Sequence, residues 1–222
     1  MTQIPFEIVG FDLDGTLLDT EADLGAAVNH ALALEGRDPV PHGETRKLIG
    51  GGGRKMLERA LSLSSGVPDE RFESLYRELI AYYEANIAVH TQPYPGCVAM
   101  LDGLAERDVK VAVVTNKRES LAVKLLGELG LARRFFTIIG GDTMGEGRAK
   151  PAPDQLHEMV VRGGGGRAAF VGDTTFDTLA AQAAGFPCVA VSFGFNDRPA
   201  PDLGATAVID HYDELIATLA LL

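Results

Sequence analysis

The sequence predicts an α/β protein whose core is a doubly wound parallel sheet, with an all-helical subdomain inserted into it. Short apolar runs rich in Val, Ile and Phe recur along the chain, and helical patterns alternate with them. The segment 20–90 breaks this alternation and contains helical patterns only. The length of 222 residues suits one domain that carries a smaller insertion. Together these observations favour a Rossmann-like core with a helical insertion.

The expected strands are short runs that are apolar throughout, as is typical of strands covered on both faces of a parallel sheet. They are Ile8–Phe11, Val109–Thr115, Phe136–Ile139, Ala168–Val171, Cys188–Val191 and Ala207–Ile209. Helices that alternate with such strands imply right-handed crossovers, and hence a sheet with helices on both faces.

The expected core helices begin and end at recognisable residues. They are Cys97–Arg107, Glu119–Leu129, Pro153–Arg162 and Thr175–Ala184. The first follows Pro95-Gly96, the second ends at Gly130, and the last ends at Gly185, a residue suited to the left-handed conformation at a helix end.

The segment between the first two strands is expected to be a helical cap domain of residues 20–90, and residues 1–19 and 91–222 form the core. Its first helix has Thr20 and Asp23 as a possible capping pair and an apolar face along Leu24, Ala27, Val28, Ala31 and Leu34. Arg54–Leu63 and Asp69–Val89 are expected to be its other helices.

Composition excludes several functional classes. With 20 basic and 31 acidic residues the net charge is −11, which argues against nucleic-acid binding and against attraction to anionic lipid. No apolar run is long enough for a membrane span, and Met1–Glu7 does not resemble a signal peptide. Two cysteines cannot form a disulfide framework, so we expect reduced thiols and a cytoplasmic protein, monomeric or homodimeric.

Asp12 and Asp14 follow directly after the first expected strand, where open parallel sheets bind ligands. Side chains at i and i+2 of extended backbone point to the same side, so the two carboxylates are expected to lie together. Gly15 leaves room for an anion to approach the backbone. Carboxylates facing an anion require a cation between them, which suggests Mg²⁺. The alternative interpretation is a polar turn.

A second pair of acids, Asp173 and Asp177, follows another expected strand. On their own they are as readily explained as an acidic helix N-terminus. Two such pairs at strand ends make a metal site the better hypothesis.

Polar residues also follow the second strand, at Thr115, Asn116 and Lys117. Lys150 precedes Pro151-Ala-Pro153, which fixes the backbone and starts a helix. Taken alone, Asn116 would be explained as part of a turn, and Lys150 as a solvated surface lysine.

These residues occur in the order of the motifs of the haloacid dehalogenase-like hydrolase superfamily, which the chain resembles over essentially its whole length. Asp12–Leu17 is similar to the first motif, Thr115 to the second, Lys150 to the third, and Gly172-Asp173 with Asp177 to the fourth. Within the superfamily the chain most resembles bacterial phosphoglycolate phosphatases, in Ile49–Arg54, Pro93–Gly96, Val113–Lys117, Gly140–Asp142 and Ala180–Gly185. It departs from them at Thr174-Thr-Phe176, where relatives often carry Ser and a polar residue, and at Gly145–Arg148.

The resemblance implies a role for each motif residue. Asp12 would attack the phosphorus to form an aspartyl-phosphate, while Asp14 would protonate the leaving oxygen and then deprotonate the attacking water. Mg²⁺ would be held by the carboxylates of Asp12 and Asp173 and by the backbone carbonyl of Asp14. The residues expected to bind the substrate or the transferring phosphoryl group are Gly15, Thr16, Thr115, Asn116, Lys117 and Lys150. Asp177 would orient Lys150 or a metal-bound water.

The glycine run Gly50–Gly53 and Arg54 lie in the expected cap. Glycine N–H groups that open a helix can bind an anion, and Arg54 could hold a carboxylate, although a flexible joint is an equal alternative. The resemblance therefore implies a Mg²⁺-dependent phosphatase of a small anionic metabolite, with 2-phosphoglycolate as the leading substrate. The alternatives are a phosphosugar mutase similar to β-phosphoglucomutase, or a phosphatase of another small phosphorylated metabolite.

Overall fold

The six apolar segments form one parallel sheet in the order β5-β4-β1-β6-β7-β8. The computed structural model describes residues 3–63 and 66–222. The strands are β1 (Ile8–Phe11), β4 (Lys110–Val114), β5 (Thr137–Ile139), β6 (Ala168–Gly172), β7 (Cys188–Val191) and β8 (Ala207–Ile209). The predicted strands and the doubly wound parallel sheet are confirmed. The four central strands β1, β4, β6 and β7 are almost entirely buried, as their apolar sequences require.

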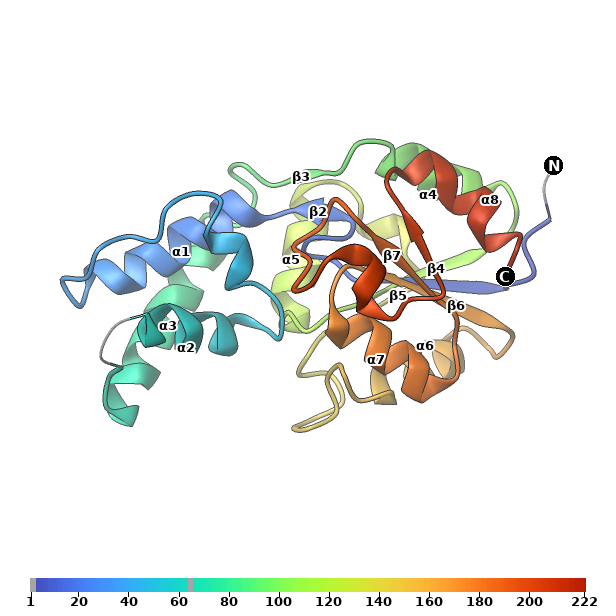
Figure 1. Cartoon of the computed structure of the whole chain (residues 1–222). Coiled ribbons are helices and arrows are strands. Elements are labelled where there is room, and N and C mark those ends of the chain that lie inside the picture. Colours follow the sequence, from blue (N-terminus) through green and yellow to red (C-terminus); the bar gives the residue numbers. More distant parts are fainter. Residues whose placement is uncertain (1–2, 64–65) are drawn as a thin grey trace.

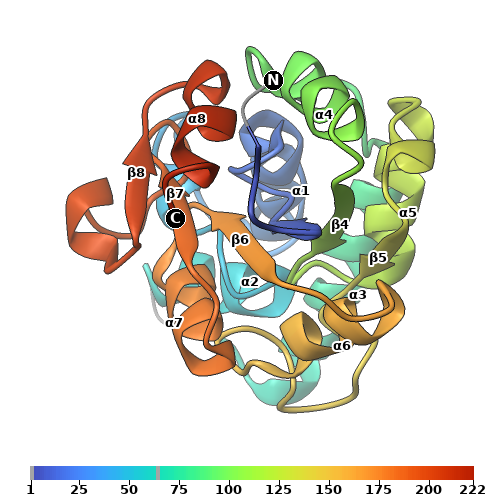
Figure 2. The same cartoon turned by 90° about the vertical axis from the view of Figure 1, so that its right-hand side faces the viewer.

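Helices cover both faces of the sheet (Figures 1 and 2). The helices are α4 (Cys97–Ala105), α5 (Glu119–Glu128), α6 (Asp154–Arg162), α7 (Thr175–Ala184) and α8 (Leu215–Leu219). Short 3₁₀ helices lie at Thr45–Lys47, Ala132–Arg134, Ala200–Leu203 and Tyr212–Glu214. Apolar side chains of α4, α5 and α8 share one buried cluster, whereas those of α6 and α7 belong to another on the opposite face. Helix α7 ends at Ala184, as predicted, and Gly185 after it adopts the left-handed conformation with φ 76°.

A lobe of three helices stands at one end of the sheet (Figure 1). It consists of α1 (Glu21–Ala33), α2 (Gly53–Ser62) and α3 (Asp69–Ala85), and we call it the helical lobe. Its longest helix stops at Ala85 instead of the predicted Val89. Asn86 leaves the helical conformation, and its side-chain amide donates a hydrogen bond to the carbonyl of Tyr82.

Two short strands join the helical lobe to the core. β2 (Leu18–Asp19) and β3 (Gln92–Pro93) pair antiparallel, so the two crossings between the lobes are bonded to each other. The predicted capping pair at the start of α1 is wrong, because Thr20 makes no capping hydrogen bond with its side chain. Asp23 instead accepts hydrogen bonds from the backbone N–H of His90 and from the N–H and hydroxyl of Thr91. Asp23 therefore links α1 to the segment that returns from the helical lobe to the core.

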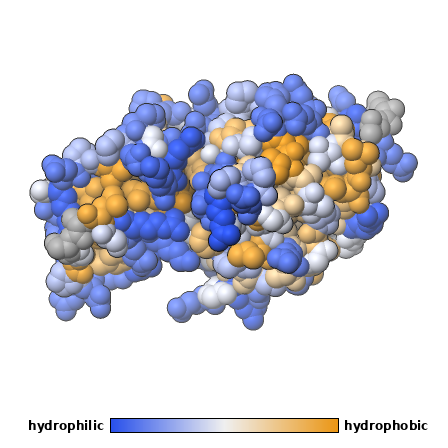
Figure 3. Space-filling model, in the orientation of Figure 1, coloured by the Kyte–Doolittle hydropathy of each residue, from blue (hydrophilic) through white to orange (hydrophobic). Residues whose placement is uncertain are grey.

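Polar side chains cover most of the face shown in Figure 3, and apolar side chains appear there as separate patches on both lobes. No helix in the described part of the chain is both long and apolar enough to cross a membrane.

Candidate active site

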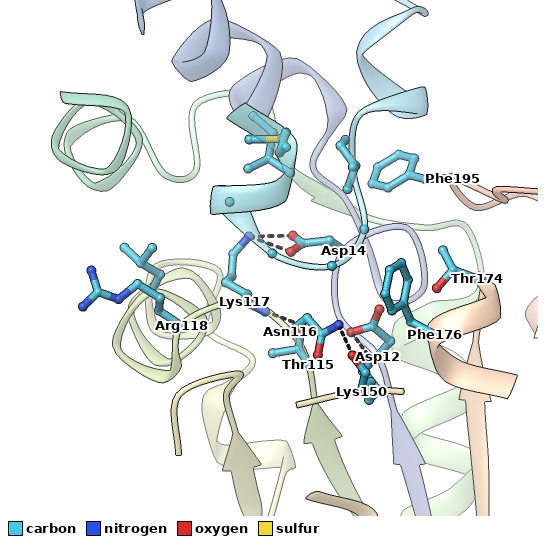
Figure 4. A pocket seen from close by; sticks show the side chains of 18 of the residues that line it. Asp12, Asp14, Thr115, Asn116, Lys117, Arg118, Lys150, Thr174, Phe176 and Phe195 are labelled. Carbon is cyan, nitrogen blue, oxygen red and sulfur yellow. Dashed lines mark hydrogen bonds and ion pairs between the residues drawn. The ribbon is translucent and has the colours of Figure 1, made fainter. Parts of the chain in front are cut away.

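The strand order brings the predicted residues to one place. β1 lies between β4 and β6, and Phe11 of β1 is in register with Val113 and Val171. The chain winds in one direction from β1 to β5 and in the other from β6 to β8, so β1 and β6 flank the switch point where such sheets bind ligands. The residues that follow these strands therefore meet at the edge of the sheet that faces the helical lobe (Figure 4).

Lys150 is the centre of a buried charge network. Its ammonium lies 3.0 Å from Oδ1 of Asp12 and 2.6 Å from Oδ1 of Asp177. Only 3% of Lys150 is exposed. Burial by itself would lower its pKa, but the two carboxylates outweigh this and raise the pKa above its ordinary value. Lys150 is therefore held as a cation next to Asp12.

Three carboxylates lie together beside this ammonium, and two of them pair with it. Asp12, Asp173 and Asp177 each place an oxygen within 4.8 Å of the others. Burial raises the pKa of Asp12 to about 6 although Lys150 opposes the shift. Burial, together with the charges of Asp177 and Asp12, raises the pKa of Asp173 well above its ordinary value. The cluster contains three carboxylates but only one ammonium, so its positive charge is too small to balance them. Carboxylate oxygens are also the ligands that Mg²⁺ prefers, and the residues therefore fit a divalent cation.

The two acids of the fourth motif have different surroundings. Asp177 accepts hydrogen bonds at Oδ2 from the backbone N–H of Asp173 and from the N–H and hydroxyl of Thr174, while its Oδ1 meets Lys150. The charge of Asp177 is thus paired with Lys150 and its side chain is fixed by Thr174, which suits an orienting residue. Asp173 makes no ion pair with any described lysine or arginine, and this leaves it the better candidate to bind a metal together with Asp12.

Asp173 is held by backbone that approaches it closely. Its oxygens accept hydrogen bonds from the hydroxyl of Thr16 at 2.8 Å and from the N–H of Phe195 at 2.7 Å. Gly15 has φ +83°, and a Cβ built there would lie 2.3 Å from Oδ2 of Asp173. Gly194 is equally confined, since its Cβ would lie 2.4 Å from the Asp173 Cβ. Gly15 and Thr16 therefore contact Asp173, and neither was found among the residues lining the cavity, where the substrate prediction had placed them.

Asp14 lies apart from the other carboxylates and pairs with Lys117. The ammonium donates to Oδ1 at 2.7 Å and to Oδ2 at 2.8 Å. Lys117 is 7% exposed, and its ammonium is 4.7 Å from the ring centre of Tyr83 in α3. Burial alone would lower the pKa of Lys117, but Asp14 raises it above the ordinary value. Two buried cations, Lys117 and Lys150, thus face the same site in a strongly acidic protein.

The end of β4 supplies two further groups. Thr115 lines the cavity, and its hydroxyl accepts a hydrogen bond from the N–H of Lys117. The amide nitrogen of Asn116 donates to the carbonyl of Lys150 at 2.9 Å, which links the second and third motifs. Its Oδ1 is buried and has no hydrogen-bond partner among the described residues.

Two residues that hold this site together were missed by sequence reasoning. Gln155 is fully buried and donates from Nε2 to the carbonyls of Thr115 and Gly140, while its Oε1 accepts from the N–H of Lys150. Asn196 donates to the carbonyl of Asp173. Neither position carries a sequence signal, because each works through contacts with residues far away in the chain.

Gly50–Gly53 line the cavity, but Arg54 does not. Its guanidinium donates to both carboxylate oxygens of Glu73, at 2.6 and 3.0 Å, and stacks over the rings of Phe72 and Tyr76. The structure thus leaves Arg54 outside the site where the sequence prediction placed it.

A cavity of about 60 Å³ lies between the sheet edge and the helical lobe. Its wall on the lobe side is mostly apolar and is formed by Leu24, Met56, Tyr76, Leu79, Ile80 and Tyr83.

The fold and the site define a class of protein: the α/β proteins that carry acids and lysines at the switch point of a parallel sheet. The family model of the haloacid dehalogenase-like hydrolases matches residues 9–191. The chain belongs to this family.

The chain is also similar to individual phosphatases and to a solved structure. A phosphoglycolate phosphatase of Agrobacterium fabrum is 40% identical over 214 residues, which are 94% of this chain and 90% of that protein. Phosphoglycolate phosphatase 1 of Pseudomonas aeruginosa is 40% identical over 97% of this chain and 80% of its own length. The crystal structure of a predicted phosphoglycolate phosphatase from Haemophilus somnus superposes with a TM-score of 0.90 at 26% identity, covering 96% of this chain and 98% of that one.

Proposed function

We propose that this protein hydrolyses 2-phosphoglycolate to glycolate and phosphate, with Mg²⁺ as cofactor and the helical lobe as its cap. The observation that carries the proposal is the meeting of Asp12, Asp14, Thr115 and Lys150 in a small cavity that also contains a second buried cation, Lys117. The similarity to phosphoglycolate phosphatases over most of both chains supports the choice of substrate.

In the proposed reaction a carboxylate oxygen of Asp12 forms a bond to phosphorus as the ester P–O bond breaks. Asp14 gives a proton to the leaving alkoxide oxygen, and glycolate departs. Asp14 then accepts a proton from water as the water oxygen attacks phosphorus, which releases phosphate and restores Asp12.

The other groups of the site stabilise the charge that moves through it. Lys150, Thr115 and the backbone after β1 would stabilise the negative charge on the phosphoryl oxygens. Asp12 and Asp173 would hold Mg²⁺, which supplies further neutralisation of these oxygens when bound.

Phosphate release from a panel of esters tests the proposal. The panel contains 2-phosphoglycolate, ribose 5-phosphate, β-glucose 1-phosphate and an aryl phosphate. We expect 2-phosphoglycolate to have the highest kcat/KM. Conversion of β-glucose 1-phosphate to its 6-phosphate without release of phosphate would instead identify a mutase.

The substrate carboxylate is expected to meet Lys117, the buried cation beside Asp14. Lys117→Met should lower kcat/KM for 2-phosphoglycolate, relative to ethyl phosphate, an alkyl ester that lacks the carboxylate, by roughly 10-fold or more, because a charge-assisted hydrogen bond contributes about 1.5–3 kcal/mol. Arg54→Met is the matched control, since Arg54 faces Glu73 and should leave this ratio unchanged. Equal losses on both substrates in Lys117→Met would show that Lys117 serves only to hold Asp14.

A further inference from the structure

The cavity has an aromatic wall that the proposed reaction does not use. Phe176 is the second residue of α7, and its ring borders the cavity beside Asp12 and Thr174 (Figure 4).

The backbone that carries this ring is fixed on both sides. Thr174 and Asp177 form a reciprocal capping box at the start of α7. Asp197 accepts hydrogen bonds from the N–H of Thr175 at 2.9 Å and from its hydroxyl at 2.5 Å. The ring is therefore held at a defined position relative to Asp12.

The ring fills the space between the core and the glycine loop of the helical lobe. A Cβ built on Gly51 would lie 3.1 Å from Cζ of Phe176, and one on Gly50 would lie 3.8 Å from Cε2. Lys55 of α2 places its ammonium 4.9 Å from the ring centre. Because the glycines carry no side chains, the loop can approach the ring, and the two together bound this side of the cavity.

We propose that Phe176 limits the size of the substrate, an inference that rests on the proposed phosphatase activity. A phosphoryl group next to Asp12, Thr115 and Lys150 leaves the rest of the ester to extend toward the lobe, between the Phe176 ring and the side of Lys117. The Phe176 ring bounds the cavity on the side of α7. In this proposal a two- or three-carbon acid stops short of the ring, whereas the longer chain of a phosphosugar would run into it.

Steady-state kinetics of Phe176→Ala test this inference. We expect the ratio of kcat/KM for ribose 5-phosphate to kcat/KM for 2-phosphoglycolate to rise roughly 10-fold or more, because the side chain that excludes the larger ester is gone. Phe176→Leu removes part of the ring volume and should give a smaller rise. It also keeps the test decisive if circular dichroism shows that the alanine variant does not fold.

Leu179→Ala is the matched control, because Leu179 lies on the same helix, is 50% exposed and does not line the cavity. It should leave the ratio unchanged. A ratio in both Phe176 variants within about twofold of the parent would overturn the inference, as would a parent that already prefers ribose 5-phosphate. If the parent releases no phosphate from 2-phosphoglycolate, the proposed substrate is wrong. The ratio between a three-carbon ester, glycerol 3-phosphate, and ribose 5-phosphate then still decides the role of Phe176.

Discussion

Asp12→Asn is expected to lower turnover by on the order of 10⁴-fold or more, to the background level, because an amide replaces the anionic oxygen that attacks phosphorus. Asp12 directly follows β1, which lies between β4 and β6, and its carboxylate lies 3.0 Å from the ammonium of Lys150. Asparagine keeps the shape of the side chain, so the fold should be retained. Phosphate release measures the turnover, and a thermal melt shows whether the fold is retained.

Asp202→Asn is the matched control, because Asp202 is exposed and lies outside the site. It should retain full activity. In the parent protein, rapid acid quenching followed by peptide mass spectrometry should find the phosphoryl group on Asp12. Its recovery on any other residue would disprove the assignment.

Removal of divalent cations is expected to abolish turnover, and added Mg²⁺ should restore it. Without a cation, the phosphate would face Asp12 and Asp173, and each pair of unit charges about 4 Å apart repels by about 4 kcal/mol at an effective dielectric constant near 20. Activity in excess chelator, followed by titration with Mg²⁺, measures this. Full activity in the chelator would exclude the metal.

Asp173→Asn provides a readout that does not depend on turnover. Mg²⁺ should raise the Tm of the parent protein, since a ligand that binds only the folded state stabilises it. The variant loses one proposed metal ligand and should need at least about 10-fold more Mg²⁺ for the same rise. Asp202→Asn should behave like the parent. An unchanged Mg²⁺ response in Asp173→Asn would place the metal elsewhere.

The core of the fold could be predicted because its signals are local. Runs such as Ile8–Phe11 and Ala168–Gly172 are apolar throughout, and they have to lie inside a covered sheet. The pairing of Leu18 with Pro93 carries no such signal, because it is made by two residues on each side. Asp23 was misassigned for a related reason: its partners His90 and Thr91 lie 67 and 68 positions away in the chain.

The same distinction separates the parts of the site that could be predicted from those that could not. Asp12 and Asp173 could be predicted because strand ends of a parallel sheet converge, whatever the distance between them in the sequence. Lys150 does not follow a strand end directly, and it was predicted from the resemblance to the third motif. Arg54 was misplaced because its neighbour Gly53 lines the cavity while its own side chain turns along α2 toward Glu73 of α3. The direction of a side chain around a helix depends on the helix start, and glycine runs do not fix that start.

The ladder of β2 and β3 has a mechanical consequence. Two separate flexible strands would let the helical lobe twist, slide and tilt, but two strands bonded to each other act as a single hinge. We expect any opening of the helical lobe to be a swing about the line through Leu18 and Pro93. Residues far from this axis would then travel furthest, and the glycine loop would return to the same place over the site on closing.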